Sequence, residues 1–202
     1  MTHFNLGAIV WAVALPLLAE ERVIDFSRFP VNALPPGFTS TVTGQGQPGD
    51  WRVILEEVPP TIPAITTNAP VVTRRPVLAQ LAQTNLDEHF PLLVFDEETF
   101  GDFTITTRFK TVAGVAEQMA GLAFRIQDPT NYYVVRASSL GGTFRFYKFV
   151  NGQRSQPSGP DLAVPKGVWH ELTVECKGNR IRCLLNGKEI IPALTDYQKG
   201  SN

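Results

Sequence analysis

The chain has 202 residues, enough for one sizeable domain with a hydrophobic core, and its 18 basic and 19 acidic side chains leave a formal net charge of −1. This near balance argues against a nucleic-acid partner, which would favour a basic face. Only 18% of the residues are charged, whereas Phe, Thr, Val, Gly and Pro are plentiful. Such a composition favours strands joined by tight turns over helices.

The N-terminus resembles an export signal. Residues 7–18 are almost entirely apolar, and the small Ala19 follows them just before three charged residues. An apolar run this short is typical of a secretory signal, because a spanning helix needs about 20 residues. Since the first five residues contain no Lys or Arg, a retained membrane anchor and a buried first strand remain alternatives. We expect a signal peptide over residues 1–19 and a secreted or periplasmic protein that has no membrane span after signal removal.

Proline and glycine interrupt the next part of the chain. Residues 23–26 (VIDF) have the pattern of a short strand, and residues 51–55 (WRVIL) predict another. Residues 59–76 hold five prolines among Thr and Ala, which predicts a long surface loop and not a linker between two cores. We therefore expect one domain over residues 20–202.

From residue 100 onward, apolar and polar side chains alternate with the period of two that is typical of half-buried strands. Residues 120–127 alternate in this way, residues 128–131 (DPTN) have the chemistry of a turn, and residues 132–140 predict the return strand. The cross-strand pairs expected from this turn are Gln127 with Tyr132, Arg125 with Val134, and Ala123 with Arg136.

A second hairpin is predicted at Gly141 and Gly142, which form a two-residue turn into a strand over residues 143–150. This turn predicts that Arg136 faces Tyr147 and that Ser138 faces Arg145. The apolar side chains of all three strands then share one face, as a core face requires. This predicted core face consists of Leu122, Phe124, Ile126, Tyr133, Val135, Ala137, Phe144 and Phe146.

A third hairpin joins residues 170–176 to residues 181–185 through a turn over residues 177–180. Its alternation places Cys176 and Cys183 on the core face, diagonal to each other. Diagonal neighbours lie about 7 Å apart or more, at the limit of disulfide geometry, so we expect buried free thiols, with a disulfide as the alternative. Several short strands separated by turns, without a helical pattern, indicate a sandwich or barrel.

Several short segments resemble the laminin G-like, concanavalin A-like sandwich, and within it the bacterial family named 3-keto-disaccharide hydrolase. The segments are residues 77–80 (VLAQ), 90–92 (FPL), 100–103 (FGDF), 131–137 (NYYVVRA), 147–148 (YK), 151–152 (NG), 167–170 (GVWH) and 186–187 (NG). The resemblance implies an all-β fold, a concanavalin A-like jelly-roll sandwich of two antiparallel sheets. Relatives continue into a final strand beyond Gly200, so we expect this domain to lack its last strand. The histidine-centred motif associated with hydrolytic members is not found here.

One set of polar and aromatic side chains is expected on the non-core face of the three-stranded meander. The forked guanidinium of arginine and side-chain amides bind sugar hydroxyls, and aromatic rings cover the C–H face of a sugar. The alternative is structural, with Arg136 over Tyr147 as a cation–π pair and Arg125 solvated. The candidate ligand-binding residues are Arg125, Gln127, Tyr132, Arg136, Arg145 and Tyr147.

Carboxylates form a second candidate site, in the loop that carries Asp96, Glu97, Glu98 and Asp102. Carboxylate and carbonyl oxygens suit calcium, although a solvated acidic loop explains the same residues. No other cofactor is expected, because the sequence contains no phosphate loop, dinucleotide fingerprint or nucleophile motif.

Three functions therefore remain open. The first is an exported carbohydrate-binding module that recognises a glycan or sugar-derived ligand on one sheet face. The second is a glycoside hydrolase that acts on 3-keto-disaccharides, as the family resemblance implies. The third is a structural domain of a larger envelope protein.

Overall fold

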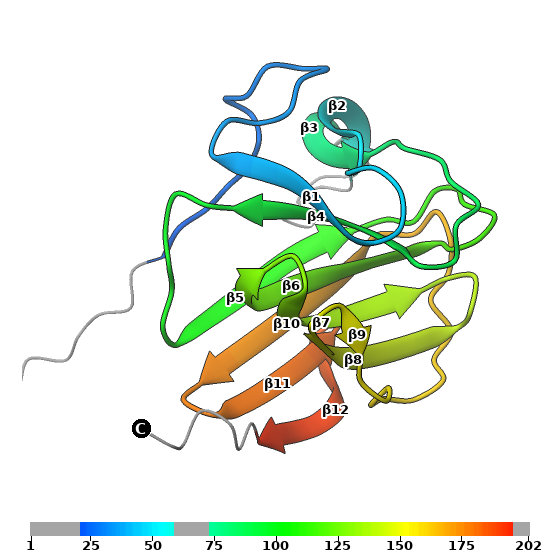
Figure 1. Cartoon of the computed structure of the whole chain (residues 1–202). Coiled ribbons are helices and arrows are strands. Elements are labelled where there is room, and N and C mark those ends of the chain that lie inside the picture. Colours follow the sequence, from blue (N-terminus) through cyan, green and yellow to red (C-terminus); the bar gives the residue numbers. More distant parts are fainter. Residues whose placement is uncertain (1–20, 59–72, 196–202) are drawn as a thin grey trace, which may run out of the picture.

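The computed structural model describes residues 21–58 and 73–195, which form an all-β fold of twelve strands (Figure 1). The predicted signal peptide, most of the Pro-rich loop and the place of the expected closing strand lie outside these residues. The strands are β1 Phe38–Gly44, β2 Trp51–Val58, β3 Thr73–Gln80, β4 His89–Phe95, β5 Phe103–Phe109, β6 Met119–Asp128, β7 Asn131–Ser138, β8 Thr143–Val150, β9 Gln153–Arg154, β10 His170–Lys177, β11 Arg180–Leu185 and β12 Lys188–Thr195.

Two four-stranded antiparallel sheets form the sandwich. The first, here called the β7 sheet, has the order β6-β7-β8-β9, and the second, the β10 sheet, has the order β12-β11-β10-β5. Two further ribbons, β1-β4 and β2-β3, complete the described fold. The prediction of an all-β antiparallel sandwich is therefore confirmed. Across residues 21–58 and 73–195 there is no helix long and apolar enough to cross a membrane.

Two predictions near the N-terminus are wrong. Residues 23–26 form no strand, because Phe26 has a positive φ of 57° that interrupts extended backbone. The predicted loop over residues 59–76 is too long, since β3 begins at Thr73 and pairs Pro76 with Leu55. Proline is tolerated there because, among the described strands, β3 pairs with β2 alone and has no ladder partner on its other edge.

The main core lies between the two sheets and follows the predicted alternation. Phe144 and Val135 from the β7 sheet and Leu172 and Val174 from the β10 sheet are fully buried. Burying a side chain of this size stabilises the fold by about 1.5–3 kcal/mol before entropy is subtracted. Because the strands are antiparallel and alternate with a period of two, every second side chain is left to face outward.

The first hairpin departs from the predicted pairing at a bulge in β6. Ala123 faces Val134 and Gly121 faces Arg136, whereas next to the turn Asp128 faces Asn131. Between these pairs β6 has two more residues than β7, and Arg125 there takes a left-handed φ of 51°. The prediction failed because it extrapolated from the turn and assumed an unbroken ladder. As a result, Ile126 turns away from the main core, where the sequence had placed it.

The second hairpin also pairs differently, because its turn contains four residues and not two. Ser138 faces Thr143, so Arg136 stands opposite Arg145 and not opposite Tyr147. The hydroxyl of Ser138 accepts a hydrogen bond from the Gly141 amide at 3.0 Å, which stabilises the longer turn. A shift of two residues keeps every side chain on its predicted face.

The third hairpin has the predicted register. Val174 faces Cys183 and Cys176 faces Ile181, so the two thiols are diagonal neighbours. Both are buried, and neither forms a disulfide within the described part of the chain. Burial, followed by the charges of Cys176 and Glu189, raises the pKa of the Cys183 thiol to about 12 from its usual 9.0.

Cys183 should therefore resist thiol reagents in the native protein. At about pH 8 only a trace of the raised-pKa thiol is thiolate, which is the reactive form, and the side chain is 1% exposed. We expect an aromatic disulfide reagent to label Cys183 only after denaturant unfolds the chain, as followed by mass spectrometry. Rapid native labelling would contradict the burial of this hairpin.

Candidate functional site

The outer face of the β7 sheet changes from apolar to basic along β7 and β8. The outward side chains form cross-strand rows, because antiparallel neighbours face each other in register. In order along the strands, the rows are Tyr132 with Phe149, Val134 with Tyr147, and Arg136 with Arg145.

The ribbon of β1 and β4 covers the apolar end of this face. Phe90 of β4 meets Phe149 edge-on at 5.6 Å between ring centroids, and Tyr132 stacks on Phe149 at 4.7 Å. The Thr43 hydroxyl of β1 donates a hydrogen bond to the Pro129 carbonyl in the turn between β6 and β7. These contacts create a second hydrophobic cluster outside the main core.

Tyr132 belongs to this second cluster and is only 3% exposed. Burial raises the pKa of its phenol above the usual value, and a hydrogen bond with Thr43 partly opposes that shift. The contacts of Tyr132 are thus packing contacts within the second hydrophobic cluster, whereas the sequence had suggested a ligand-binding role. The sequence could not reveal this burial, because the covering strand lies some 40 positions away in the chain.

Replacing Phe90 with alanine should detach the ribbon from the β7 sheet. The loss of its ring contacts is expected to cost roughly 2–4 kcal/mol of unfolding free energy in denaturant titrations. Amide exchange should accelerate in β1 and β4 much more than in β10 and β11. The matched control is Phe100→Ala, since Phe100 is half exposed, and unchanged protection of β1 and β4 would contradict the layered arrangement.

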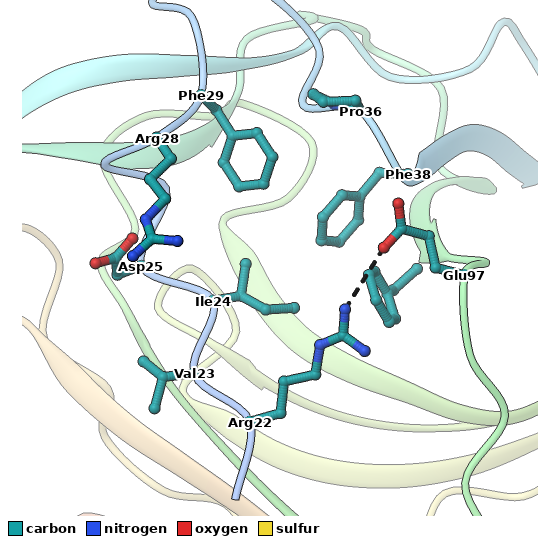
Figure 2. A pocket seen from close by; sticks show the side chains of 10 residues that line it. Arg22, Val23, Ile24, Asp25, Arg28, Phe29, Pro36, Phe38 and Glu97 are labelled. Carbon is teal, nitrogen blue, oxygen red and sulfur yellow. Dashed lines mark ion pairs between the residues drawn. The ribbon is translucent and has the colours of Figure 1, made fainter.

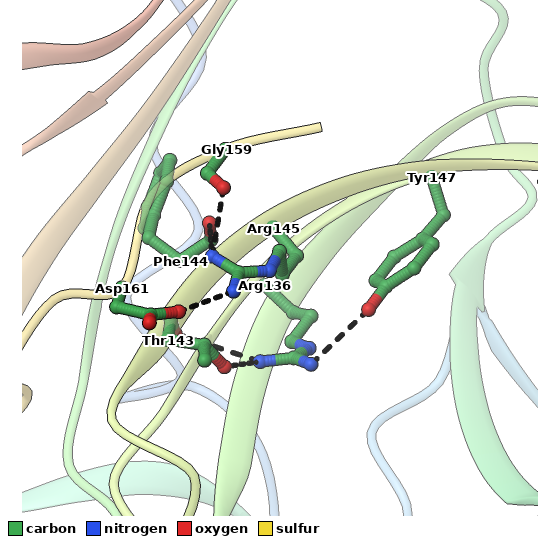
Figure 3. A network of polar contacts seen from close by, with 7 residues as sticks. All are labelled: Arg136, Thr143, Phe144, Arg145, Tyr147, Gly159 and Asp161. Atoms are coloured by element: carbon green, nitrogen blue, oxygen red, sulfur yellow. Dashed lines mark hydrogen bonds and ion pairs between the residues drawn. The ribbon is translucent and has the colours of Figure 1, made fainter. Parts of the chain in front are cut away.

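The basic end of the face is organised by Arg136. Its Nη1 donates to the Thr143 hydroxyl and, at 3.5 Å, to the Thr143 carbonyl, and its Nη2 donates to the Tyr147 hydroxyl at 3.2 Å (Figure 3). The guanidinium carbon also lies 5.7 Å from the Tyr147 ring centroid. The expected cation–π pair therefore exists, but it is diagonal, because Arg136 stands opposite Arg145.

Arg145 is held by the loop that follows β9. Its Nη1 donates to the Gly159 carbonyl at 2.8 Å, and its Nη2 forms an ion pair with Asp161 (Figure 3). Isolated bridges of Thr143 with Asp161 and of Phe146 with Ser158 hold this loop beside β8. Arg145 thus has a carboxylate partner, whereas Arg136 forms no ion pair with any residue in the described ranges.

Arg154 of β9 joins the same group, although it was not among the six candidate residues. Its guanidinium carbon lies 5.1 Å from the Tyr147 ring centroid and 5.7 Å from that of Phe90. The turn at Asn151 and Gly152 was a usable signal, because it pairs Arg154 with the outward-facing Phe149. We call Arg136, Arg145, Arg154 and Tyr147 the arginine cluster.

Of the six candidate residues, the structure brings Arg136, Arg145 and Tyr147 into the arginine cluster. Arg125 lies elsewhere: its Nη2 donates to the Gly178 carbonyl in the β10–β11 turn at 2.6 Å, and its guanidinium stacks at 5.6 Å on Tyr133, which packs against the main core. Arg125 and Arg136 therefore occupy opposite faces of the β7 sheet, because the bulge redirects Arg125. Gln127 is exposed in the bulged segment.

The carboxylates of the acidic loop form hydrogen bonds and ion pairs with other residues of the protein. Asp96 accepts a hydrogen bond from Thr39, Asp102 accepts one from the Gly178 amide at 2.7 Å, and Glu97 and Glu98 both pair with Arg22. No group of three or more His, Cys, Asp or Glu side chains within the described ranges is arranged to hold a metal ion. Calcium binding by this loop stays a prediction.

Two hollows on the described surface lie away from the arginine cluster. One of about 420 Å³ lies between residues 22–29 and the β1-β4 ribbon, where Phe29, Phe38 and Phe95 provide ring surface and Arg22 reaches toward Glu97 (Figure 2). The other, of about 230 Å³, is on the outer face of the β10 sheet, where Arg182 already pairs with Glu175.

Both described histidines have structural contacts. His170 is 6% exposed, bonds the Pro165 carbonyl at 3.1 Å and packs against Phe109. His89 contacts the Gln47 carbonyl at 2.7 Å. Neither contact is with the arginine cluster.

A solved structure and a family model are similar to this chain. A structure titled carbohydrate-binding module CBM66 from Bacillus subtilis is similar over 57% of this chain and 74% of its own, with 22% identity and a TM-score of 0.47. No curated protein is significantly similar in sequence. The family model described as a 3-keto-alpha-glucoside-1,2-lyase-like domain matches residues 50–201, a segment that contains the whole arginine cluster. The chain therefore belongs to the 3-keto-alpha-glucoside-1,2-lyase-like family.

Proposed function

We propose that this domain binds a carbohydrate at the arginine cluster. The observation that carries the proposal is the state of Arg136. Its five N–H groups meet three acceptors among the described residues, two on Thr143 and one on Tyr147, and it has no carboxylate partner there. Two donors therefore remain for a ligand, on a side chain that is already held in place.

The chemistry of the cluster suits hydroxyl and carbonyl oxygens better than ring stacking. Tyr147 is only 7% exposed, so its ring supports the guanidiniums of Arg136 and Arg154 and offers little surface to a sugar face. A planar guanidinium can donate two parallel hydrogen bonds to adjacent oxygens of a saccharide. Family membership independently supports a carbohydrate-related function.

Arg136→Ala should abolish binding on a glycan array, whereas Arg136→Lys should retain only a weak remnant, because lysine keeps the charge but loses the fork. The expected loss is at least about tenfold in affinity for the alanine variant, since hydrogen bonds to charged groups contribute about 1.5–3 kcal/mol. Arg180→Ala is the control, because Arg180 is an exposed arginine on the β10 sheet. Full binding by Arg136→Ala would reject the site.

A second candidate function is elimination on a 3-keto-glucoside, and membership of the lyase-like family favours it. In that reaction a base removes the C2 proton, the C1–O bond breaks, and the departing alcohol takes a proton, which leaves an unsaturated 3-keto sugar. The remaining Arg136 donors would stabilise the enolate oxygen at C3. Glu117 would serve as the base, since it contacts Ser138, the next outward residue of β7, at 3.5 Å.

This candidate predicts that the domain releases alcohol from a 3-keto-glucoside and forms an unsaturated sugar, both visible by NMR. Glu117→Gln should lower the rate by at least about 100-fold, because a positioned base contributes that much. Glu171→Gln on the β10 sheet is the matched control. Absence of any product, or equal rates for both variants, would exclude the elimination at this site.

A further inference from the structure

The arginine cluster carries more positive charge than its neighbours neutralise. Arg136 and Arg154 lie against the ring of Tyr147, and Arg145 stands opposite Arg136. Asp161 is the one carboxylate that pairs with any of the three arginines in the described part of the chain. Three guanidiniums less one carboxylate leave two positive charges. Arg136 and Arg145 also stand directly opposite each other, an arrangement that is destabilising in itself.

The protein holds two of these charges partly away from water. The Arg145 side chain is 17% exposed and Arg136 is half-buried, whereas Arg154 is exposed. A lower local dielectric strengthens the attraction of Arg136 and Arg145 for an anion. Hydrogen bonds to Thr143 and Tyr147 orient Arg136 beforehand, which reduces the entropy lost on binding.

The cluster already binds one carboxylate, that of Asp161, through Arg145. The Asp161 side chain is 86% exposed, whereas Arg145 is largely covered, so the acid reaches the cluster from the solvent side. A ligand carboxylate arriving from solvent would find the same approach to Arg136 and Arg154, which pair with no described carboxylate.

We propose that the ligand of this face is an acidic saccharide, whose carboxylate binds Arg136 and Arg154 next to the Arg145–Asp161 pair. This inference rests on the carbohydrate binding proposed above and specifies its ligand class. Neutral sugar hydroxyls would leave both excess charges uncompensated, whereas one carboxylate accepts a bidentate pair of hydrogen bonds and neutralises one charge.

The test compares two ligands of equal length, a galacturonate oligomer and a galactose oligomer, by calorimetric titration into the full chain. The galacturonate oligomer should bind at least about tenfold more tightly, and rising ionic strength should weaken it selectively. Equal affinities would overturn the acidic ligand and leave carbohydrate binding intact. Failure of both oligomers and of every glycan on the array would remove both proposals.

Two variants separate this role from structural support. Arg154→Ala should lower the affinity ratio of the acidic over the neutral oligomer, because it removes one uncompensated charge. Asp161→Asn should raise that ratio by about two- to fivefold, since it removes a competing carboxylate from an exposed ion pair. Replacing a residue that only supports the fold would not raise the affinity for the acidic oligomer. If Asp161→Asn lowers the ratio of acidic to neutral affinity, or leaves it unchanged, the proposal is overturned. Arg180→Ala again serves as the control and should leave the ratio unchanged.

Discussion

The antiparallel pairing of β7 with β8 is the constraint on which the rest of this structure depends. It turns Val135 and Phe144 inward against the β10 sheet and, in the same ladder, places Arg136 opposite Arg145 on the outside. One set of backbone hydrogen bonds therefore positions both the main core and the basic face. Such a face requires no separate scaffold, because period-two geometry supplies an outward side chain for every buried one.

The β7 sheet supports hydrophobic contacts on both faces. Its inner face forms the main core, and the first half of its outer face is closed by Phe90 and Leu92 of β4. The apolar contacts end at Tyr147. Its ring belongs to the second cluster, and its hydroxyl accepts a hydrogen bond from Arg136. The polar site thus begins where the apolar packing ends, and Tyr147 belongs to both.

Alternation predicted which face most residues of the sandwich occupy, because burial depends on a period of two that local sequence displays directly. It failed where a local rule was broken: a bulge at Arg125 and a four-residue turn after Ser138 each shifted the pairing by two positions. The second shift preserved faces, whereas the bulge moved Arg125 to the inner side. The burial of Tyr132 depends on a strand distant in the chain, and no local pattern encodes such a contact.

The bulge in β6 has a consequence for how the layers depend on each other. Phe124, just before it, packs in the main core, and Ile126, within it, packs in the second cluster. A single strand therefore anchors two hydrophobic layers on opposite sides within three residues. If β6 lost the two residues that it has in excess of β7, the ladder would become even and Ile126 would turn inward. A deletion in this strand would therefore disturb both hydrophobic layers together while the strand itself remained.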